Sequence, residues 1–177
     1  MSKNDIKLYI IIDFDGIGTF YENAIKKEEY DADGFVDFLA NKPIFSGSGN
    51  KSLIISSDTN YKWVLCNLQE LDSYDQPKKP LELNCIKFNS VDKIGNPEEF
   101  WFSIFERSEN ITVNGNELIL VTGTGCPSDM IEISTVKKIG QKKINLLYTI
   151  NFNFQSGGET KVGSIDPIID NRTDPEG

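Results

Sequence analysis

The 177-residue sequence has no histidine, only three alanines, three cysteines and no long apolar run. Without histidine the chain cannot build a Ser-His-Asp or Cys-His catalytic site, or a zinc site with imidazole ligands. It also lacks the side chain that most hydrolases use to move protons near neutral pH. These absences exclude the commonest hydrolytic mechanisms, and we predict that the protein is not an enzyme and uses no cofactor.

Cysteine usage and hydrophobicity indicate the compartment. Cys66, Cys85 and Cys126 are odd in number, widely spaced and never in a Cys-x-x-Cys pair, which argues against a secreted disulfide framework. No stretch approaches the roughly 20 apolar residues of a membrane helix, and the N-terminus lacks the long apolar region of a signal peptide. We expect a reduced, cytoplasmic, bacterial protein without a membrane span.

The charge is strongly acidic. The 27 acidic and 18 basic side chains give a formal charge of −9, with a pI near 4.6. Nucleic acid is excluded as a partner, because binding phosphates requires a clustered basic surface. A charge of this size keeps a strand-rich protein soluble and opposes its self-association. Self-association should therefore strengthen as salt rises or as pH falls toward 4.6.

Abundant β-branched and aromatic residues favour strands over helices. The clearest strand covers residues 143–155, where apolar and polar residues alternate with the period of a strand that has one buried face. Its apolar residues are Ile144, Leu146, Tyr148, Ile150, Phe152 and Phe154. The other candidate strands are 6–13, 52–56, 61–68, 81–88, 99–107, 117–122 and 130–137. Turn-forming clusters separate them, as at Ser156-Gly157-Gly158.

This pattern predicts an all-β fold, an antiparallel β-sandwich of jelly-roll or immunoglobulin-like type. At most one or two short helices are expected, one of them around residues 22–29. Residues 1–177 should form a single sandwich domain, with residues 166–177 as an extended tail and residues 72–80 as an exposed loop.

An acidic motif follows the first strand. Asp13-Phe14-Asp15-Gly16 resembles the start of haloacid-dehalogenase-type phosphatases, in which the first aspartate is the nucleophile and the second protonates the leaving group. That family needs alternating strands and helices, which the rest of the sequence does not provide. Asp13 and Asp15 are also weak candidates for a metal site, together with Asp166 or Asp170. An EF-hand is excluded, because its fifth and twelfth positions would be Ile17 and Ala24.

Other motifs point to structure rather than to chemistry. Gly123-Thr124-Gly125 lacks the ending of a phosphate loop and is interpreted as a hairpin turn, and Cys126 has no basic neighbour in the sequence to activate it.

Trp63 and Trp101 could line a sugar-binding groove, although large aromatic residues in a sandwich usually fill the core. Phe100-Trp101-Phe102 cannot all face inward on one strand, so one should be exposed or lie at an interface. The polar face of the clearest strand could face solvent or form a contact surface; its residues are Asn145, Thr149, Asn151 and Asn153.

The order of several short motifs resembles the AidA/PixA family of bacterial inclusion-body proteins. Those motifs are the strand that ends at Ile12-Asp13, Ser46-Gly47-Ser48-Gly49, the Trp63 strand, the aromatic strand 148–154 and Ile165-Asp166-Pro167-Ile168. The chain departs from the family at Ile165, where an aromatic residue is usual. The resemblance implies a cytoplasmic β-sandwich that self-associates or forms dense inclusions, linked to stationary-phase, quorum or host-associated states. It supplies no catalytic residues.

The leading hypothesis is therefore a non-enzymatic, self-associating protein that forms homo-oligomers. The alternative is a lectin-like module that binds a carbohydrate or another small molecule.

Overall fold

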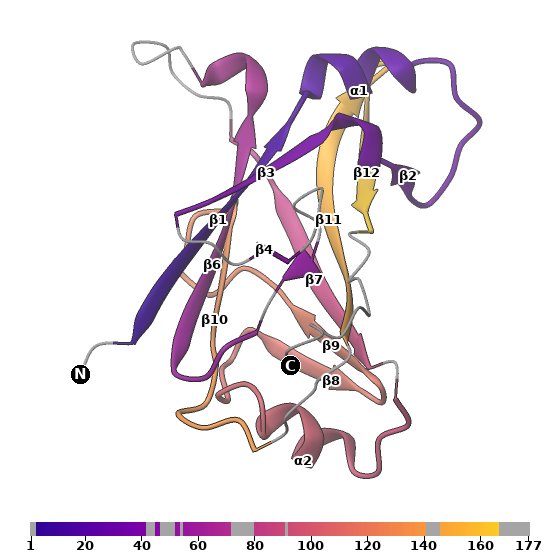
Figure 1. Ribbon diagram of the computed structural model, residues 1–177. Coiled ribbons are helices and arrows are strands. Elements are labelled where there is room, and N and C mark those ends of the chain that lie inside the picture. Colours follow the sequence, from indigo (N-terminus) through magenta and orange to yellow (C-terminus); the bar gives the residue numbers. More distant parts are fainter. Residues whose placement is uncertain are drawn as a thin grey trace.

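Two β-sheets face each other across one hydrophobic core in the computed structural model (Figure 1), which describes residues 3–41, 45–46, 52–53, 55–71, 80–90, 92–140 and 146–166. The four-stranded sheet has the order β10 (Met130–Ser134), β6 (Thr59–Asn67), β1 (Asn4–Ile12), β3 (Val36–Ala40). The six-stranded sheet has the order β2 (Tyr30–Asp31), β12 (Glu159–Ile165), β11 (Leu146–Ser156), β7 (Leu83–Ser90), β9 (Glu117–Leu120), β8 (Ile111–Asn114). A separate ladder joins β4 (Phe45–Ser46) and β5 (Ser52–Leu53).

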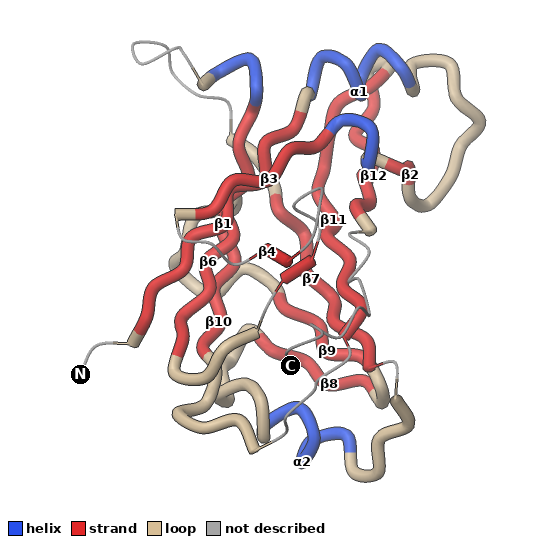
Figure 2. The backbone as a smooth tube through the Cα atoms, in the orientation of Figure 1, coloured by secondary structure: helices blue, strands red, loops and turns tan. Residues whose placement is uncertain are grey.

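Helices are few and short, and they lie at the two ends of the sheets (Figure 2). They are α1 (Phe14–Phe20), α2 (Pro97–Phe102) and the 3₁₀ turns η1 (Asp33–Phe35) and η2 (Leu68–Glu70). The predicted all-β sandwich is confirmed. The prediction of purely antiparallel pairing is wrong in two places, since β1 runs parallel to β6 and β12 runs parallel to β2. Between β1 and β6 the chain first forms β2, which belongs to the other sheet. It then forms β3, which pairs antiparallel with β1 on the edge of β1 that faces away from β6.

The clearest predicted strand is present as β11. Its alternating apolar residues are at most 3 % exposed and face the core: Leu146, Tyr148, Ile150, Phe152 and Phe154. A hairpin joins β11 to β12, and Gly157 and Gly158 have positive φ values of 60° and 76° at its turn. Positive φ at two successive turn residues is the geometry that suits a two-residue hairpin and favours glycine. The predicted Ser-Gly-Gly turn is thus confirmed.

Two predicted elements are wrong. Residues 99–107 were expected to form a strand, but α2 covers residues 99–102. It begins at Pro97, and the Asn96 side chain caps it by accepting a hydrogen bond from the Glu99 amide (3.2 Å). Residues 22–29 were expected to contain a helix, but the chain turns there and α1 lies earlier. Asp13 caps α1 by accepting a hydrogen bond from the amide of Gly16.

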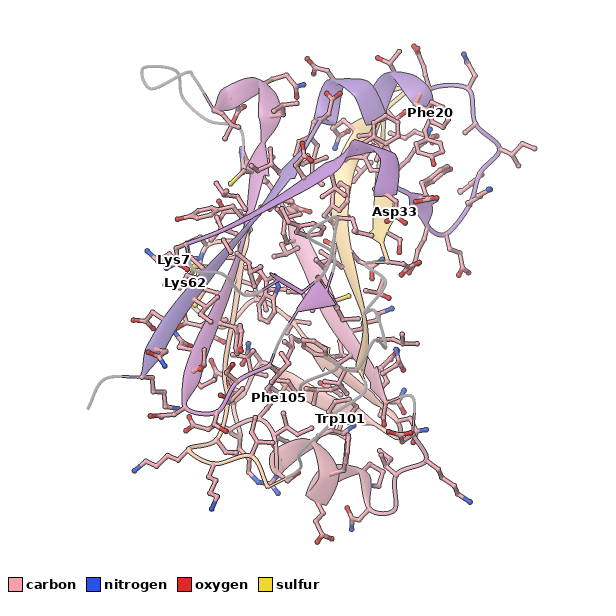
Figure 3. The ribbon with its side chains drawn as sticks, viewed as in Figure 1. Lys7, Phe20, Asp33, Lys62, Trp101 and Phe105 are labelled. Carbon is pink, nitrogen blue, oxygen red and sulfur yellow. The ribbon has the colours of Figure 1, made fainter. Side chains whose placement is uncertain are left out.

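Aromatic rings from both sheets join the two layers. Phe88 of β7 has its ring centroid 6.2 Å from that of Trp63 in β6 and 5.4 Å from that of Phe105. Trp101 is fully buried, and Figure 3 shows Trp101 and Phe105 near α2, at the end of the molecule opposite α1. The core therefore extends from one end of the sandwich to the other.

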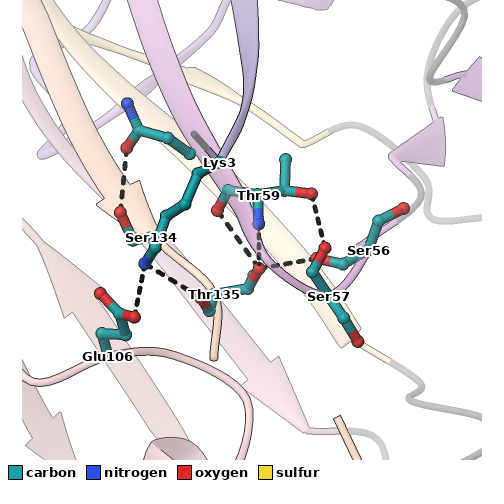
Figure 4. Close-up of polar contacts among 8 residues, drawn as sticks. Lys3, Ser56, Ser57, Thr59, Glu106, Ser134 and Thr135 are labelled. Carbon is teal, nitrogen blue, oxygen red and sulfur yellow. Dashed lines mark hydrogen bonds and ion pairs between the residues drawn. The ribbon is translucent and has the colours of Figure 1, made fainter. Parts of the chain in front are cut away.

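A polar network closes the sandwich where β6 begins and β10 ends (Figure 4). The buried hydroxyl of Thr135 accepts a hydrogen bond from the Thr59 amide (2.9 Å) and donates one to the Ser56 carbonyl (2.7 Å). Lys3 reaches the Thr135 carbonyl (3.5 Å) and forms an ion pair with Glu106. These groups satisfy backbone atoms at the end of the sheet, so their role is structural.

Candidate functional site

The two aspartates singled out in the sequence lie at the start of α1, beside η2. One carboxylate oxygen of Asp13 accepts hydrogen bonds from the Gly16 amide (2.9 Å) and from Nε2 of Gln69 (2.5 Å). The backbone amide of Asp15 donates to Oε1 of the same Gln69 (3.5 Å). Asp13 thus caps a helix and ties it to η2. Over the described ranges, no group of three or more His, Cys, Asp or Glu side chains could hold a metal ion.

Asp166 has different partners from Asp13. Its amide donates to a carboxylate oxygen of Asp33 (3.1 Å), and its own carboxylate accepts from the Thr149 hydroxyl (2.8 Å). Asp170 lies outside the described residues, as does the predicted tail beyond Asp166. The described structure therefore gives no support for a site shared by Asp13 and Asp166.

The Gly123-Thr124-Gly125 segment is not a hairpin, because it connects β9 in one sheet to β10 in the other. Gly123, Thr124 and Cys126 line a polar pocket of about 350 Å³. Three glutamates and one arginine also line this pocket: Glu106, Glu109, Glu132 and Arg107. The Arg107 guanidinium lies 4.0 Å from the centre of the Phe102 ring and 3.9 Å from Glu98. An acidic lining whose one arginine is engaged elsewhere does not suit phosphate.

Both tryptophans fill the core, as sandwich packing favours, with Trp63 1 % and Trp101 0 % exposed. The Trp101 indole N–H donates to the Gly115 carbonyl (3.3 Å). Neither ring offers a face on which a sugar could stack. Phe100-Trp101-Phe102 lies on α2 instead of a strand, with Phe100 and Phe102 both half-buried, so the expectation that at least one of the three lies at an interface stays a prediction.

The polar face of β11 is partly closed. Asn153 accepts a hydrogen bond from the Asn84 side chain (2.6 Å), and Asn151 is only 3 % exposed. Cys85 donates to Oδ1 of Asn151 (3.6 Å), and burial raises the pKa of the Cys85 thiol. That thiol therefore stays protonated, which removes it as a nucleophile. Asn145 lies outside the described residues.

Sequence reasoning missed an apolar row on the outside of the four-stranded sheet. Strand register places Leu39, Tyr9, Val64 and Met130 side by side on β3, β1, β6 and β10. Ile11 and Cys66 pair in the next outward-facing row. Leu39 is 57 % exposed and the others are half-buried. We call these six residues the outer apolar face.

A lysine row borders the outer apolar face. Lys7 pairs with Lys62, which also pairs with Glu132, and Figure 3 shows both lysines on the outer side of the sheet. One signal in the sequence pointed to this face. Residues 8–12 are continuously apolar, which is typical of a strand that is buried on both faces. In the described part of this sandwich, only one face of β1 packs against the core.

The outer apolar face deepens into a groove of about 540 Å³. We call this the apolar groove; Tyr9, Val64, Cys66, Leu71, Leu81 and Pro127 form its walls. The side of η2 contributes Glu70, and the segment before β10 contributes Asp129. Apolar walls with a few polar groups are typical of binding sites.

The fold and this surface define a two-sheet β-sandwich protein with an apolar row on the outside of its four-stranded sheet. No described helix is long and apolar enough to cross a membrane. No protein-family model matches the chain, and a comparison with curated proteins finds no match. Among solved structures, the chain is similar to the crystal structure of the inclusion body protein PixA from Burkholderia cenocepacia J2315. The match covers 93 % of both chains at 9 % identity, with a TM-score of 0.39. PixA is a member of the family that the sequence motifs resemble.

Proposed function

We propose that this chain is a non-enzymatic cytoplasmic protein that associates with copies of itself, and that the outer apolar face is its contact surface. The cross-strand row of Leu39, Tyr9, Val64 and Met130 carries the proposal. The largest contiguous apolar patch on a soluble protein is often a functional interaction site. The motifs shared with the AidA/PixA family support the same function, and with it a part in dense inclusions during stationary-phase, quorum or host-associated states.

The chemistry of the chain supports a binding role over catalysis. The sequence has no histidine, the half-buried Cys85 thiol is held protonated, and exposed Cys126 lies in a pocket lined by three glutamates. None of these arrangements activates a nucleophile. An apolar sheet face needs no such group, because association driven by burial of apolar surface depends on area and fit.

Size-exclusion chromatography with light scattering tests this function. Val64 lies at the centre of the outer apolar face, and Lys62 two residues earlier shows that β6 accepts an outward lysine. We expect the wild type to form species larger than a monomer, and Val64→Lys to weaken that association at least about tenfold. Leu147→Lys is the matched control, since Leu147 is 46 % exposed on the other sheet. A wild-type protein that stays strictly monomeric at high concentration would refute the proposal.

A second candidate is binding of a small polar ligand such as a glycan, and the polar pocket favours it. In that pocket Asn60 donates to a carboxylate oxygen of Glu132 (2.6 Å), so amide and carboxylate groups are held in place. A glycan array, read with and without Ca²⁺, decides this question. Binding that disappears in Asn60→Ala would support it, and silence under both conditions would dismiss it.

A further inference from the structure

Charges of opposite sign lie on the two sides of the apolar row, the name we give to the cross-strand row of Leu39, Tyr9, Val64 and Met130. On one side, the next outward row holds Asp37, which is exposed on β3. On the other side, the next outward row holds Lys7 and Lys62 (Figure 3). Among the described residues none of these three side chains forms an ion pair. Each copy of the chain therefore carries unpaired charges of both signs beside one apolar surface.

The other described charges near the apolar row keep this division. Glu70 and Asp129, beside the apolar groove, are acidic and lie on the Asp37 side. Glu132 lies in the lysine row, where it pairs in register with Lys62. Asp5 lies one row beyond the lysines, about 13 Å from the apolar row. The lysines are therefore confined to one side, and the described charges on the other side are acidic.

Two copies can stack these faces about a two-fold axis in two ways, because sheets packed face to face keep their strands within about 30° of each other. An axis along the strands places each row over the same row of the second copy, so lysines meet lysines and acids meet acids. An axis along the apolar row places that row over itself and reverses the strands. The lysine row of each copy then lies over the Asp37 side of the other, and this electrostatic match favours the second arrangement.

Resting on the proposed self-association, we infer that the chain forms a two-fold dimer in which two outer apolar faces pack with antiparallel strands. In this dimer Lys7 of each copy faces Ile11 of the other and pairs with Asp37, which lies beside Ile11 in register. Such a contact uses the same patch on both copies, so it closes and does not grow. Association beyond the dimer requires a different surface.

The size of the outer face sets the strength of this dimer. Four strands and four outward rows span about 500 Å² per copy. A standard stable interface buries about 800 Å² per partner, so this contact is at the low end of specific interfaces. The dimer should therefore be weak and form at high protein concentration.

Two charge reversals and their mixture test the pairing. In Lys7→Glu acids meet acids at both ends of the contact, and in Asp37→Lys lysines meet lysines, so each should weaken the dimer about tenfold. A mixed dimer of the two variants restores both attractions and should form within about threefold of the wild-type affinity. Lys138→Glu and Glu28→Lys are matched controls, because they make the same charge changes at exposed positions outside this face. Asp37→Lys is the sharper variant, since it lowers the net negative charge that opposes association.

Sedimentation velocity over a wide concentration range, on each protein and on the equimolar mixture, gives the decisive result. We expect a monomer–dimer equilibrium for the wild type, weaker dimers for each variant, and recovery in the mixture, which also shows that both variants fold. If Asp37→Lys dimerises as well as Glu28→Lys, or if the mixture is no better than the variants alone, the inference is overturned while the proposed function stands. The same holds if the wild type passes from monomer to larger species without a dimer. If the wild type is strictly monomeric, both proposals fail.

Discussion

Gly163 on β12 lies opposite Phe152 on β11, and the Phe152 ring occupies the space in which a side chain at position 163 would begin. A Cβ added to Gly163 would lie 2.5, 2.7 and 3.0 Å from three carbons of that ring. Ordinary contact begins at 3.4 Å, so Gly163→Ala requires the ring or the strand to move by 3.4 − 2.5, or about 0.9 Å. The substitution therefore tests how tightly this part of the core is packed.

The ring has little room to move. Phe152 is fully buried, and its ring centroid lies 5.8 Å from that of Phe14 and 6.2 Å from that of Phe154. Overpacking a close-packed core costs about 1–3 kcal/mol. With three close contacts we expect Gly163→Ala to lower the free energy of unfolding by about 2–3 kcal/mol. In a domain of this size that is a fall in Tm of roughly 4–12 °C.

Urea unfolding and thermal melts followed by circular dichroism measure this loss. Gly34→Ala is the control, because a Cβ there meets no atom within 4 Å, and it should stay within about 0.5 kcal/mol of the wild type. Phe152→Leu in the Gly163→Ala background should recover part of the stability by freeing the space. If Gly163→Ala is as stable as Gly34→Ala, the ring does not pack against β12 as described.

Three further substitutions test single groups. Nδ2 of Asn151 is buried and has no partner among the described residues, so Asn151→Val should raise the free energy of unfolding by about 1 kcal/mol; a loss in urea titration would contradict this. Burial raises the pKa of Tyr148, so the folded state resists an ionisation that the unfolded chain undergoes near pH 10. The stabilisation is full below about pH 10 and is lost as pH rises above it. Tyr148→Phe should flatten that alkaline loss in urea titrations, and an unchanged slope would refute the assignment. Asp13→Ala should cost about 1 kcal/mol through loss of the α1 cap, whereas Asp13→Asn should cost less than about 0.5 kcal/mol, and equal losses would contradict a capping role.

The sequence predicted the strand content well because alternation is a local signal. The apolar face of β11 and the glycine turn that follows it were both correct, since each depends on a few neighbouring residues. The parallel pairing of β1 with β6 could not be predicted in this way. A strand's pattern shows which face is buried, but not which strand lies beside it.

The errors at the helices have a common cause. Asp13 and Asn96 each accept a hydrogen bond from the amide three residues later and start a helix. Turns and helix caps use the same short polar side chains, so composition alone does not separate them. The short strand β3 was missed for a related reason: its Asp37 and exposed Leu39 blur the alternation of an edge strand.

The candidate contact surface could not be predicted from any single segment. Leu39, Tyr9, Val64 and Met130 come from four strands, and only the register brings them into one row. The continuous apolar run 8–12 hinted that β1 had an apolar outer side, but its neighbours were unknown. The sequence indicated self-association in general terms, and the sheet order supplied the surface.

Net charge opposes the proposed assembly. Copies that each carry −9 repel one another. Raising salt from about 0.01 to 0.15 M shortens the screening length from about 30 Å to about 8 Å, which removes long-range repulsion more than short contacts. Association should therefore strengthen over this range, and again as pH falls toward 4.6, where the net charge vanishes. Light scattering over this range of salt and pH measures the change. Association that falls steadily with salt, or that ignores both salt and pH, would contradict this balance.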